Sequence, residues 1–448
     1  MLLTEEMNAK WSDVLDHKAA PAIKDPYKRA VTAVLLENVE KDLKENRVHV
    51  PTNMLLEGGI PVNFMGTSSS TAGAGGIDTF DPVLISMVRR QVPNLIAYDI
   101  VGVQPMNGPT GQVFAMRPRY SNQTGAESWY NEVNTMFSSV LSGANTLGNK
   151  QVGSLPQQNG AANGTYNYGG GMARAQAEAL GTTGNSAFPS MAFTIDKNTV
   201  TANSRALATD YTLEMAQDLK AIHGMDARTE LINLLSTEIL SEINREIVRT
   251  VNIAASIGAQ DNTTAPGIFD LDTDSNGRWS VEKWKGLMFQ LDRERNAVAK
   301  STRRGLGNIA IMSSDVASAL SAAGILSYTP AIEGNANMNI DDTGPTFAGV
   351  VNGKLKVYID PYSSGGQYIT VGYKGTSPWD AGIYYCPYVP LQLVNAVDPT
   401  SFTPRLGFKT RYGVQANPFA QGLGTSSTGA IGVDNNVYYR KFLVNNLM

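Results

Sequence analysis

The strongest pattern along the chain is a four-residue apolar repeat between residues 227 and 257. Six apolar side chains recur at every fourth position and three more widen the stripe: Leu231, Leu235, Ile239, Ile243, Ile247 and Val251, with Ile232, Leu240 and Val248. This spacing predicts one amphipathic helix over 227–257, capped by Asp226 and closed by Gly258. Its predicted solvent-exposed face carries two pairs of opposite charge, Glu242 with Arg245 and Glu246 with Arg249. At 1.5 Å per residue the helix would run roughly 45 Å, which suits a spine.

The first 57 residues differ from the rest of the chain in charge. Charged side chains make up 18 of them, about twice the density of the residues that follow. Apolar residues recur at helical spacing from Ala30 to Leu43, which predicts a solvated amphipathic helix. Pro51 and the pair Gly58-Gly59 separate this helix from the next segment. Residues 1–57 are therefore interpreted as a detachable leader.

Two segments alternate apolar and polar positions as strands do, 112–119 and 192–196. The stretch between them, 121–190, holds only five charged residues but eleven glycines and nine asparagines. Such a composition lacks the apolar content for a core of its own. The simplest prediction is a long β-hairpin that carries residues 121–190 as a surface insertion at its tip.

From about residue 305 the pattern becomes mixed. Short apolar runs separated by Gly, Pro and Asp predict strands at 308–312, 355–359, 368–373 and 383–393, and Ser and Asp open a short helix at 313–323. Together with the hairpin and the long helix, these elements predict an α+β fold.

The composition of the chain excludes several classes of protein. The 448 residues carry a net charge of −4, so the clustered basic charge of a protein that coats duplex DNA is missing. The single cysteine, Cys386, excludes an intrachain disulfide and is interpreted as a buried apolar filler. No apolar run approaches the ~20 residues that a membrane span needs.

Candidate catalytic and metal-binding motifs are weak. The chain has three histidines, two of them in the leader, which argues against hydrolytic chemistry. Gly349–Lys354 is one residue short of a phosphate loop and is better interpreted as a hairpin turn. Asp272, Asp274 and Asn276 match the start of a calcium loop, although Lys283 stands where a bidentate Glu belongs. A calcium-dependent, lectin-like surface protein is the alternative from another class, and otherwise no cofactor is expected.

Four groups of motifs, in order, are similar to those of the T-even-type phage major capsid proteins. They are MVRRQVPNLIAYD at 87–99 with GVQPMNGPTGQVF at 102–114; LEMAQDLKAIHGMD at 213–226; FAGV at 347–350 with YID at 358–360 and VGYKG at 371–375; and GFKTRYG at 407–413 with NPF at 417–419. The resemblance covers nearly the whole chain outside 121–190. It implies the HK97-like capsid fold.

The resemblance also implies a division of the chain. The expected parts are a propeptide at 1–57, an N-terminal arm at 58–111, a long hairpin called the E-loop at 112–200, a peripheral domain at 201–304, an axial domain at 305–395, and a return to the peripheral domain at 396–448. The T-even-type proteins carry a larger folded insertion in the same hairpin than 121–190 provides here.

The function implied by the resemblance is structural. The subunit would form hexameric capsomers of an icosahedral or prolate head that encloses double-stranded DNA without sequence-specific binding, after assembly in the bacterial cytoplasm. Implied partners are the vertex, portal, scaffold, decoration and maturation protease proteins of the phage. The related vertex protein, which forms pentamers, is the alternative within the family.

Two sets of residues carry these expectations. Arg89, Arg90, Arg117 and Arg119 are candidates for ion pairs between subunits, because they lie along the arm and hairpin that extend toward neighbours. The resemblance further implies cleavage after a Leu/Ile-x-Glu tripeptide, and Leu55-Leu56-Glu57 followed by Gly58 matches it. The same tripeptide at 35–37 lies inside the predicted helix, where a protease could not extend the backbone.

Overall fold

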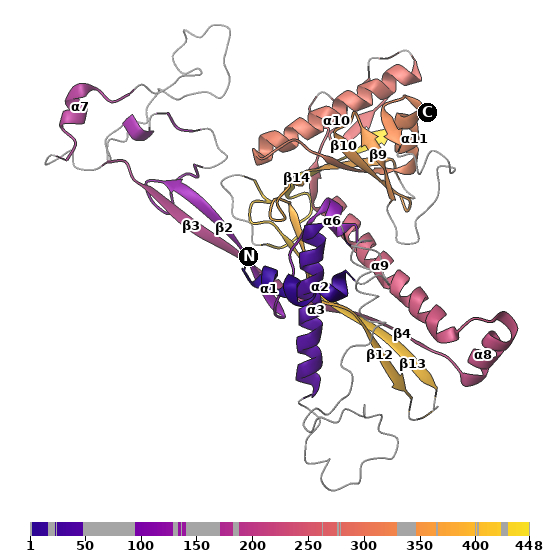
Figure 1. Ribbon diagram of the computed structural model, residues 1–448. Coiled ribbons are helices and arrows are strands. Elements are labelled where there is room, and N and C mark those ends of the chain that lie inside the picture. The colour runs from indigo at the N-terminus through magenta and orange to yellow at the C-terminus, as the bar shows by residue number, and fades with distance from the viewer. Residues whose placement is uncertain are drawn as a thin grey trace.

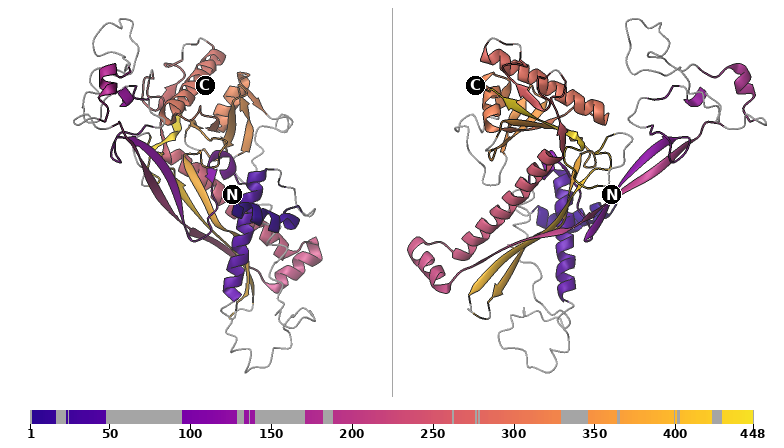
Figure 2. Two further views of the ribbon diagram at one scale, coloured as in Figure 1. Left: turned by 60° about the vertical axis from the view of Figure 1, so that its left-hand side comes forward. Right: turned by 180° about the vertical axis from the view of Figure 1, so that it is seen from behind.

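The computed structural model describes residues 2–16, 23, 25–47, 95–128, 133–135, 137–139, 171–181, 188–261, 263–275, 277, 279–328, 346–363, 366–398, 400, 403–422 and 429–447. These residues form two sheets with long helices packed on them, an N-terminal layer of helices, and a hairpin that projects to one side (Figure 1). The turned views in Figure 2 confirm that the hairpin and the long helix α9 extend in different directions from a shared centre.

The helices are α1 (Leu2–Lys10), α2 (Ser12–Leu15), α3 (Pro26–Arg47), α6 (Ala97–Ile100), α7 (Arg174–Glu178), α8 (Leu213–Asp218), α9 (Ala227–Ala254), α10 (Ser280–Thr302) and α11 (Ser314–Ala322), with the short turns η1 (Phe137–Ser139) and η2 (Leu219–His223). The strands are β1 (Gly102–Val103), β2 (Thr110–Tyr120), β3 (Met191–Thr201), β4 (Asn203–Asp210), β5 (Ala255–Ile257), β6 (Ile268–Asp270), β7 (Ile309–Ser313), β8 (Leu326–Tyr328), β9 (Thr346–Val351), β10 (Leu355–Asp360), β11 (Tyr368–Gly372), β12 (Ile383–Val397), β13 (Pro404–Ala416) and β14 (Asn436–Asn445).

The long apolar repeat forms α9, which lies along a four-stranded sheet of order β1-β12-β13-β4. The side chains of Leu235, Ile239, Ile243 and Ile247 are all buried, as the repeat predicts. Asp226 caps the first turn by accepting a hydrogen bond from the Arg228 amide at 3.2 Å. The helix ends at Ala254, three residues before the predicted end, because 255–257 extend as β5 and pair with β14.

The polar face of α9 does not form the pairs expected from its spacing. Glu242 and Glu246 instead bind Arg205 of β4 at 2.9 and 2.6 Å. Arg245 reaches Asp360 at the end of β10, at 2.6 Å. The Asp360 carboxylate is almost fully buried, and a buried charge without a partner costs more free energy than an exposed one. Arg245 therefore pairs with Asp360 of β10 and not with Glu242 of its own helix. These charges tie α9 to both sheets.

The second sheet has the order β5-β14-β11-β7-β10-β9-β8, with β6 also paired to β14. The predicted strands at 308–312, 355–359 and 368–373 are confirmed as β7, β10 and β11, and the short helix is confirmed as α11. The predicted turn after Gly349 joins β9 to β10. There Asn352 and Gly353 both adopt positive φ, 49° and 66°, as a tight hairpin turn requires.

Two strand pairings cross the boundaries of the expected division. β12, placed at 305–395 in the expected axial domain, pairs with β13 and β1 in the four-stranded sheet. The last strand, β14, pairs with β11 in the second sheet, so the C-terminal segment returns to both sheets. A local pattern of apolar residues shows that a strand exists but does not identify its neighbour, so the sequence could not assign β12 and β14 to a sheet.

The predicted hairpin is confirmed. β2 and β3 pair antiparallel over eleven positions, from Thr110 opposite Thr201 to Tyr120 opposite Met191. Residue 202 alone separates β3 from β4, so the hairpin is continuous with the four-stranded sheet. With the spine helix and the two sheets, the hairpin completes the α+β, HK97-like architecture that was predicted. Most of the insertion at 121–190 lies outside the described residues.

The prediction that the leader helix is solvated is wrong. Every side chain of α3 from Val31 to Leu36 is buried, and so is Val39. α3 crosses β12 on one side and is covered by α1 on the other (Figure 1). A helix that is apolar on most of its circumference belongs in a core, and residues 31–36 contain only one polar side chain, Thr32.

Candidate assembly surfaces

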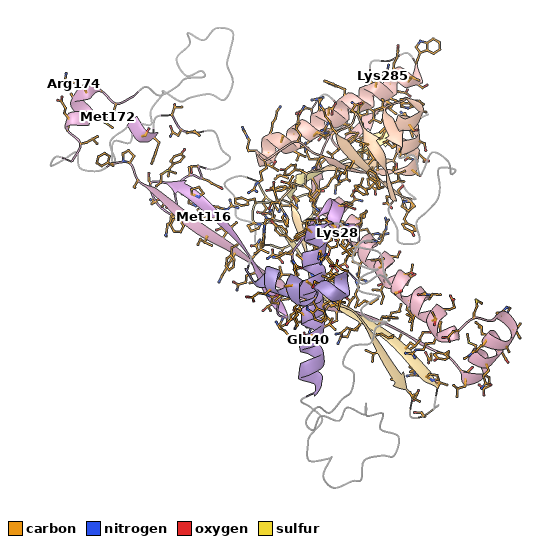
Figure 3. All side chains as sticks on the ribbon, in the orientation of Figure 1. Lys28, Glu40, Met116, Met172, Arg174 and Lys285 are labelled. Atoms are coloured by element: carbon orange, nitrogen blue, oxygen red, sulfur yellow. The ribbon has the colours of Figure 1, made fainter. Side chains whose placement is uncertain are left out.

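One side of the β2–β3 hairpin carries a row of exposed apolar side chains. This hairpin face comprises Phe114, Met116, Met191, Phe193 and Ile195, which are 50–63% exposed. The strand register places Met116 opposite Ile195 and Tyr120 opposite Met191, so the row is continuous across both strands. Figure 3 labels Met116 midway along the hairpin, away from the body of the molecule. A projecting apolar row of this kind is typical of a protein–protein contact.

A second apolar group lies at the far end of α9. This peripheral tip comprises Leu213, Met215, Ile222, Met225 and Leu234, contributed by α8, η2, the connection at 224–226 and the first turns of α9. Thr212 caps α8 by accepting a hydrogen bond from the Met215 amide at 3.3 Å, which holds the turn in place. The hairpin face and the peripheral tip lie on opposite sides of the subunit (Figure 1), so each can meet a different neighbour.

Arg117 lies on the other side of the hairpin and is fully buried. Its guanidinium lies 2.7 Å from Asp196 and 2.9 Å from Glu127, and it donates to the Pro418 carbonyl at 2.7 Å. The Phe419 ring packs against it at 4.4 Å. Arg117 has no exposed surface to offer a neighbouring subunit, which contradicts the prediction. The strand pattern correctly placed Arg117 in the hairpin, but it could not show that a distant loop covers this side.

The Arg117 cluster fixes the outer half of the hairpin, near its insertion end, to the body of the subunit. Phe419 also packs against Arg304, at 5.1 Å, and Arg304 binds Asp380 at 2.9 Å. The Phe419 ring thus contacts two arginines, one from the hairpin and one from the segment after α10, and itself belongs to the β13–β14 connection. Removing one partner of a buried ion pair typically costs about 3–5 kcal/mol, so this junction holds the hairpin at a defined angle.

Three other arginines were predicted, with Arg117, to form ion pairs between subunits. Arg119 donates to the Thr194 hydroxyl at 3.1 Å and to the Gly125 carbonyl at 2.9 Å, both within the hairpin and its insertion. It is partly exposed, so a contact with a neighbour stays a prediction. Arg89 and Arg90 lie outside the described residues, as do Glu57 and Gly58 of the predicted processing site.

The calcium-loop candidate is filled by protein donors. The Asp274 carboxylate accepts hydrogen bonds from the amides of Thr264 and Asp270, at 2.8 and 3.0 Å. These bonds lower its pKa against the opposing effect of burial. Asp272 forms an ion pair with Lys283, the residue at the twelfth loop position. A lysine ammonium therefore stands where calcium would balance the charge, and Asn276 lies outside the described residues.

The thiol of Cys386 also has a structural role. Burial raises the pKa of the Cys386 thiol to about 12, which keeps it protonated and unreactive, as expected for an apolar filler. Within the described ranges no three His, Cys, Asp or Glu side chains are grouped to hold a metal ion. None of the described helices is both long enough and apolar enough to cross a membrane.

The leader (residues 1–57) packs against the rest of the chain, here called the shell part, along a line of contacts that we call the seam. Tyr27 packs edge-on against Tyr98 with ring centroids 6.4 Å apart, and the Lys28 ammonium lies 5.1 Å from the Tyr98 ring. Further along α3, the Asn38 amide donates to the main-chain carbonyls of Met106 and Tyr388, each at 2.8 Å. The pattern at 30–43 predicted the helix, but nothing in it marked Asn38 as a buried side chain that bonds to distant main chain.

Comparison with known proteins gives a consistent result over the full chain. A family model described as "Major capsid protein Gp23" matches residues 77–444. The chain is 39% identical to the major capsid protein of Serratia phage KSP90, over 100% of this chain and 99% of that protein. It is 36% identical to the major capsid protein of Enterobacteria phage T4, over 98% of each. The capsid vertex protein of phage T4 is 29% identical over only 51% of this chain and 53% of that protein.

Solved structures also match over most of the chain at low identity. The capsid protein of Myoviridae phage XM1 aligns over 78% of this chain and 92% of its own length, with 8% identity and a TM-score of 0.39. A protein of Mycobacterium phage Bobi aligns over 79% and 91%, with 12% identity and a TM-score of 0.38.

Proposed function

This chain belongs to the Gp23 family of major capsid proteins, and from that premise we propose that it builds hexameric capsomers of a phage head that encloses double-stranded DNA. It is a structural component of the virion capsid and not an enzyme. The observation that carries the proposal is the hairpin face, an exposed apolar row on a hairpin whose opposite side is fixed to the body by Arg117.

The contact proposed for the hairpin face is a neighbouring subunit of the same kind. Fully burying one large apolar side chain contributes about 1.5–3 kcal/mol, so the five residues of the row supply a moderate contact. Moderate contacts suit a closed shell, because each encounter stays reversible while the sum over several neighbours is large. The peripheral tip would supply a second contact, and Arg119 a polar one at the insertion.

The hexamer is favoured over the pentamer by the extent of the relationship. Major capsid relatives align with this chain from end to end, whereas the vertex relative aligns with about half of it. The vertex role therefore remains the second candidate. Purified particles distinguish the two by copy number, since a hexamer-forming subunit is present in large excess over a vertex subunit.

The role toward DNA would be enclosure without sequence recognition. The 36 basic residues are outnumbered by 40 acidic ones, so the chain has no excess of positive charge for phosphate neutralisation and the shell would border packed DNA without binding it tightly. Portal, vertex, scaffold and decoration proteins are the further partners that a head of this kind would require.

We also propose that residues 1–57 are a propeptide, removed by the phage maturation protease after Glu57. The second copy of the tripeptide supports this choice of site. Leu35 and Leu36 are buried within α3, so that copy cannot enter a protease cleft unless the helix unfolds. Removal of the leader would free volume on the inside of the shell and make the step irreversible.

Assembly of the double variant Phe193→Asp, Ile195→Asp tests the proposal. Both side chains are exposed, so the subunit should fold with unchanged circular dichroism and thermal midpoint. Capsomers and shells should be lost, because two charges would be buried in each contact. The conservative variant Ile195→Val should assemble normally. Normal shells from the double variant would exclude the hairpin face as the contact.

A further inference from the structure

The leader is part of the hydrophobic core of the shell subunit. Val31, Leu35 and Leu36 of α3 belong to the same buried cluster as Ile239 and Ile243 of the spine helix α9. The cluster also contains Trp11, which lies between α1 and α2, and Leu15 of α2. A helix that only anchored the subunit to something else would not need this degree of burial.

The segment between the leader and the spine explains why the core needs α3. Residues 95–101 contain one short helix, α6, and are almost entirely buried. On the spine side, the Asn244 side chain accepts a hydrogen bond from the Ile96 amide at 3.1 Å. On the leader side, Tyr98 meets Tyr27 and Lys28, and Figure 3 places Lys28 at this end of α3. α3 thus forms the second wall around a segment with little structure of its own.

Asn38 adds directional contacts to this wall. Its amide nitrogen donates to Met106 just before the hairpin and to Tyr388 within β12, and both bonds are buried or nearly so. Two main-chain carbonyls from segments about 280 residues apart in the sequence are thereby held at one point. A buried carbonyl without a donor is unfavourable, so this bond pair favours the native register of the two segments over alternatives.

We propose that the leader is an intramolecular folding template for the shell part of the chain. While the subunit folds, α3 supplies one wall of the core around residues 95–101 and β12 and sets the relative position of the hairpin base and β12. This role needs only that the leader be present during folding, so it is independent of the propeptide cleavage proposed above. It also predicts an order of events, since a subunit that lost its leader before assembly would have an incomplete core.

The experiment starts from the full chain with the recognition sequence of a site-specific protease placed at 55–60. After cutting of the folded protein, the leader fragment should co-elute with the shell fragment. The cut protein is then unfolded in urea, and the fragments are separated and returned to native buffer alone or together. We expect at least a tenfold lower yield of soluble, native shell fragment without the leader fragment, and recovery when the leader fragment is added back.

Two leader variants separate templating from unspecific solubilisation. A fragment with Leu35→Asp should fail to restore the yield, because Leu35 is only 4% exposed in the native core. A fragment with Lys41→Ser, exposed on the same helix, should restore it fully. Co-expression of the two fragments in cells repeats the comparison for the case in which urea-unfolded protein does not recover. Equal yields with and without the leader, or equal rescue by the Leu35→Asp fragment, would overturn the proposal.

Discussion

The helices α3 and α9 look alike in sequence and share one core, yet their charged residues are used differently. Those of α9 bind other parts of the shell, as in the pair of Arg245 with Asp360. The ion pairs near α3 stay within the leader: Lys10 binds Glu37 at 2.8 Å, and Arg29 binds Asp16 at 2.8 Å. Lys28 contacts the shell part through the face of the Tyr98 ring and not through an ion pair. Apart from Asn38, the described contacts between α3 and the shell are apolar or aromatic.

If the leader is removed as proposed, this difference explains how one core can hold both a permanent helix and a removable one. Apolar packing is non-directional, so separating the leader as a unit would break few hydrogen bonds and no internal ion pair of the leader. Separating α9 would leave buried partners such as Asp360 without their cation. Both helices stabilise the subunit. The described ion pairs of α3 lie within the leader, whereas those of α9 join it to other elements.

The largest effect is expected for Ile243→Asp in α9. Ile243 is 1% exposed, so the aspartate would place a charge in a dry core and cost about 4 kcal/mol or more. Soluble, shell-forming protein should be lost. Ile253→Asp on the same helix is the matched control, because Ile253 is 49% exposed and lies outside the peripheral tip. If the Ile243→Asp protein formed normal shells, the assignment of α9 as the buried spine would be wrong.

A smaller but substantial loss is expected for Leu36→Ala in α3. Leu36 is 1% exposed, and truncation of a buried leucine costs about 2–5 kcal/mol. Urea denaturation of the uncut subunit should show this decrease in the free energy of unfolding. If leader removal empties this site, mature particles that carry the variant should match the wild type in thermal midpoint. A subunit with unchanged unfolding would mean that α3 is not part of the core.

The contrast in charge can be tested by removing one cation from each helix layer. Arg245→Met leaves the buried Asp360 with the Tyr368 hydroxyl and the Tyr362 amide as donors, and should cost about 2 kcal/mol. Lys10→Ala removes a pair whose lysine is 47% exposed, and should cost well under 1 kcal/mol. Thermal unfolding of both variants measures the difference, and equal losses would contradict the distinction between the two helices.

The smallest effect concerns Lys374 beside the seam. Its ammonium donates to the Tyr98 carbonyl, and burial lowers the pKa of Lys374 to about 8 from 10.5. Between these values the unfolded chain binds more protons than the folded one, so stability rises with pH from about 8 toward 10.5. Lys374→Met should reduce the rise between pH 7.5 and 9.5 by on the order of 1 kcal/mol in urea titrations. An unchanged slope would mean that this lysine is not buried at the seam.

The sequence predicted the elements better than their environments. The period of four in α9 and the alternation in β2 and β3 are local patterns, so helix, hairpin and buried face could all be predicted from them. The burial of Arg117 depends on Pro418 and Phe419, about 300 residues away, and no local pattern contains that contact. The charged residues that follow in α3 favour a solvated helix, but the apolar run at 31–36, interrupted only by Thr32, favours a buried one. That run was the available signal.

We propose that the leader packs into the core of the subunit and is nevertheless removed when the head matures. Intact-mass spectrometry of subunits from DNA-filled particles tests it directly, with precursor particles as the comparison. We expect precursor subunits to retain residues 1–57 and mature subunits to begin at Gly58, with α9 and the whole of 58–448 retained. A subunit that still carries residues 1–57 in DNA-filled particles would contradict the account.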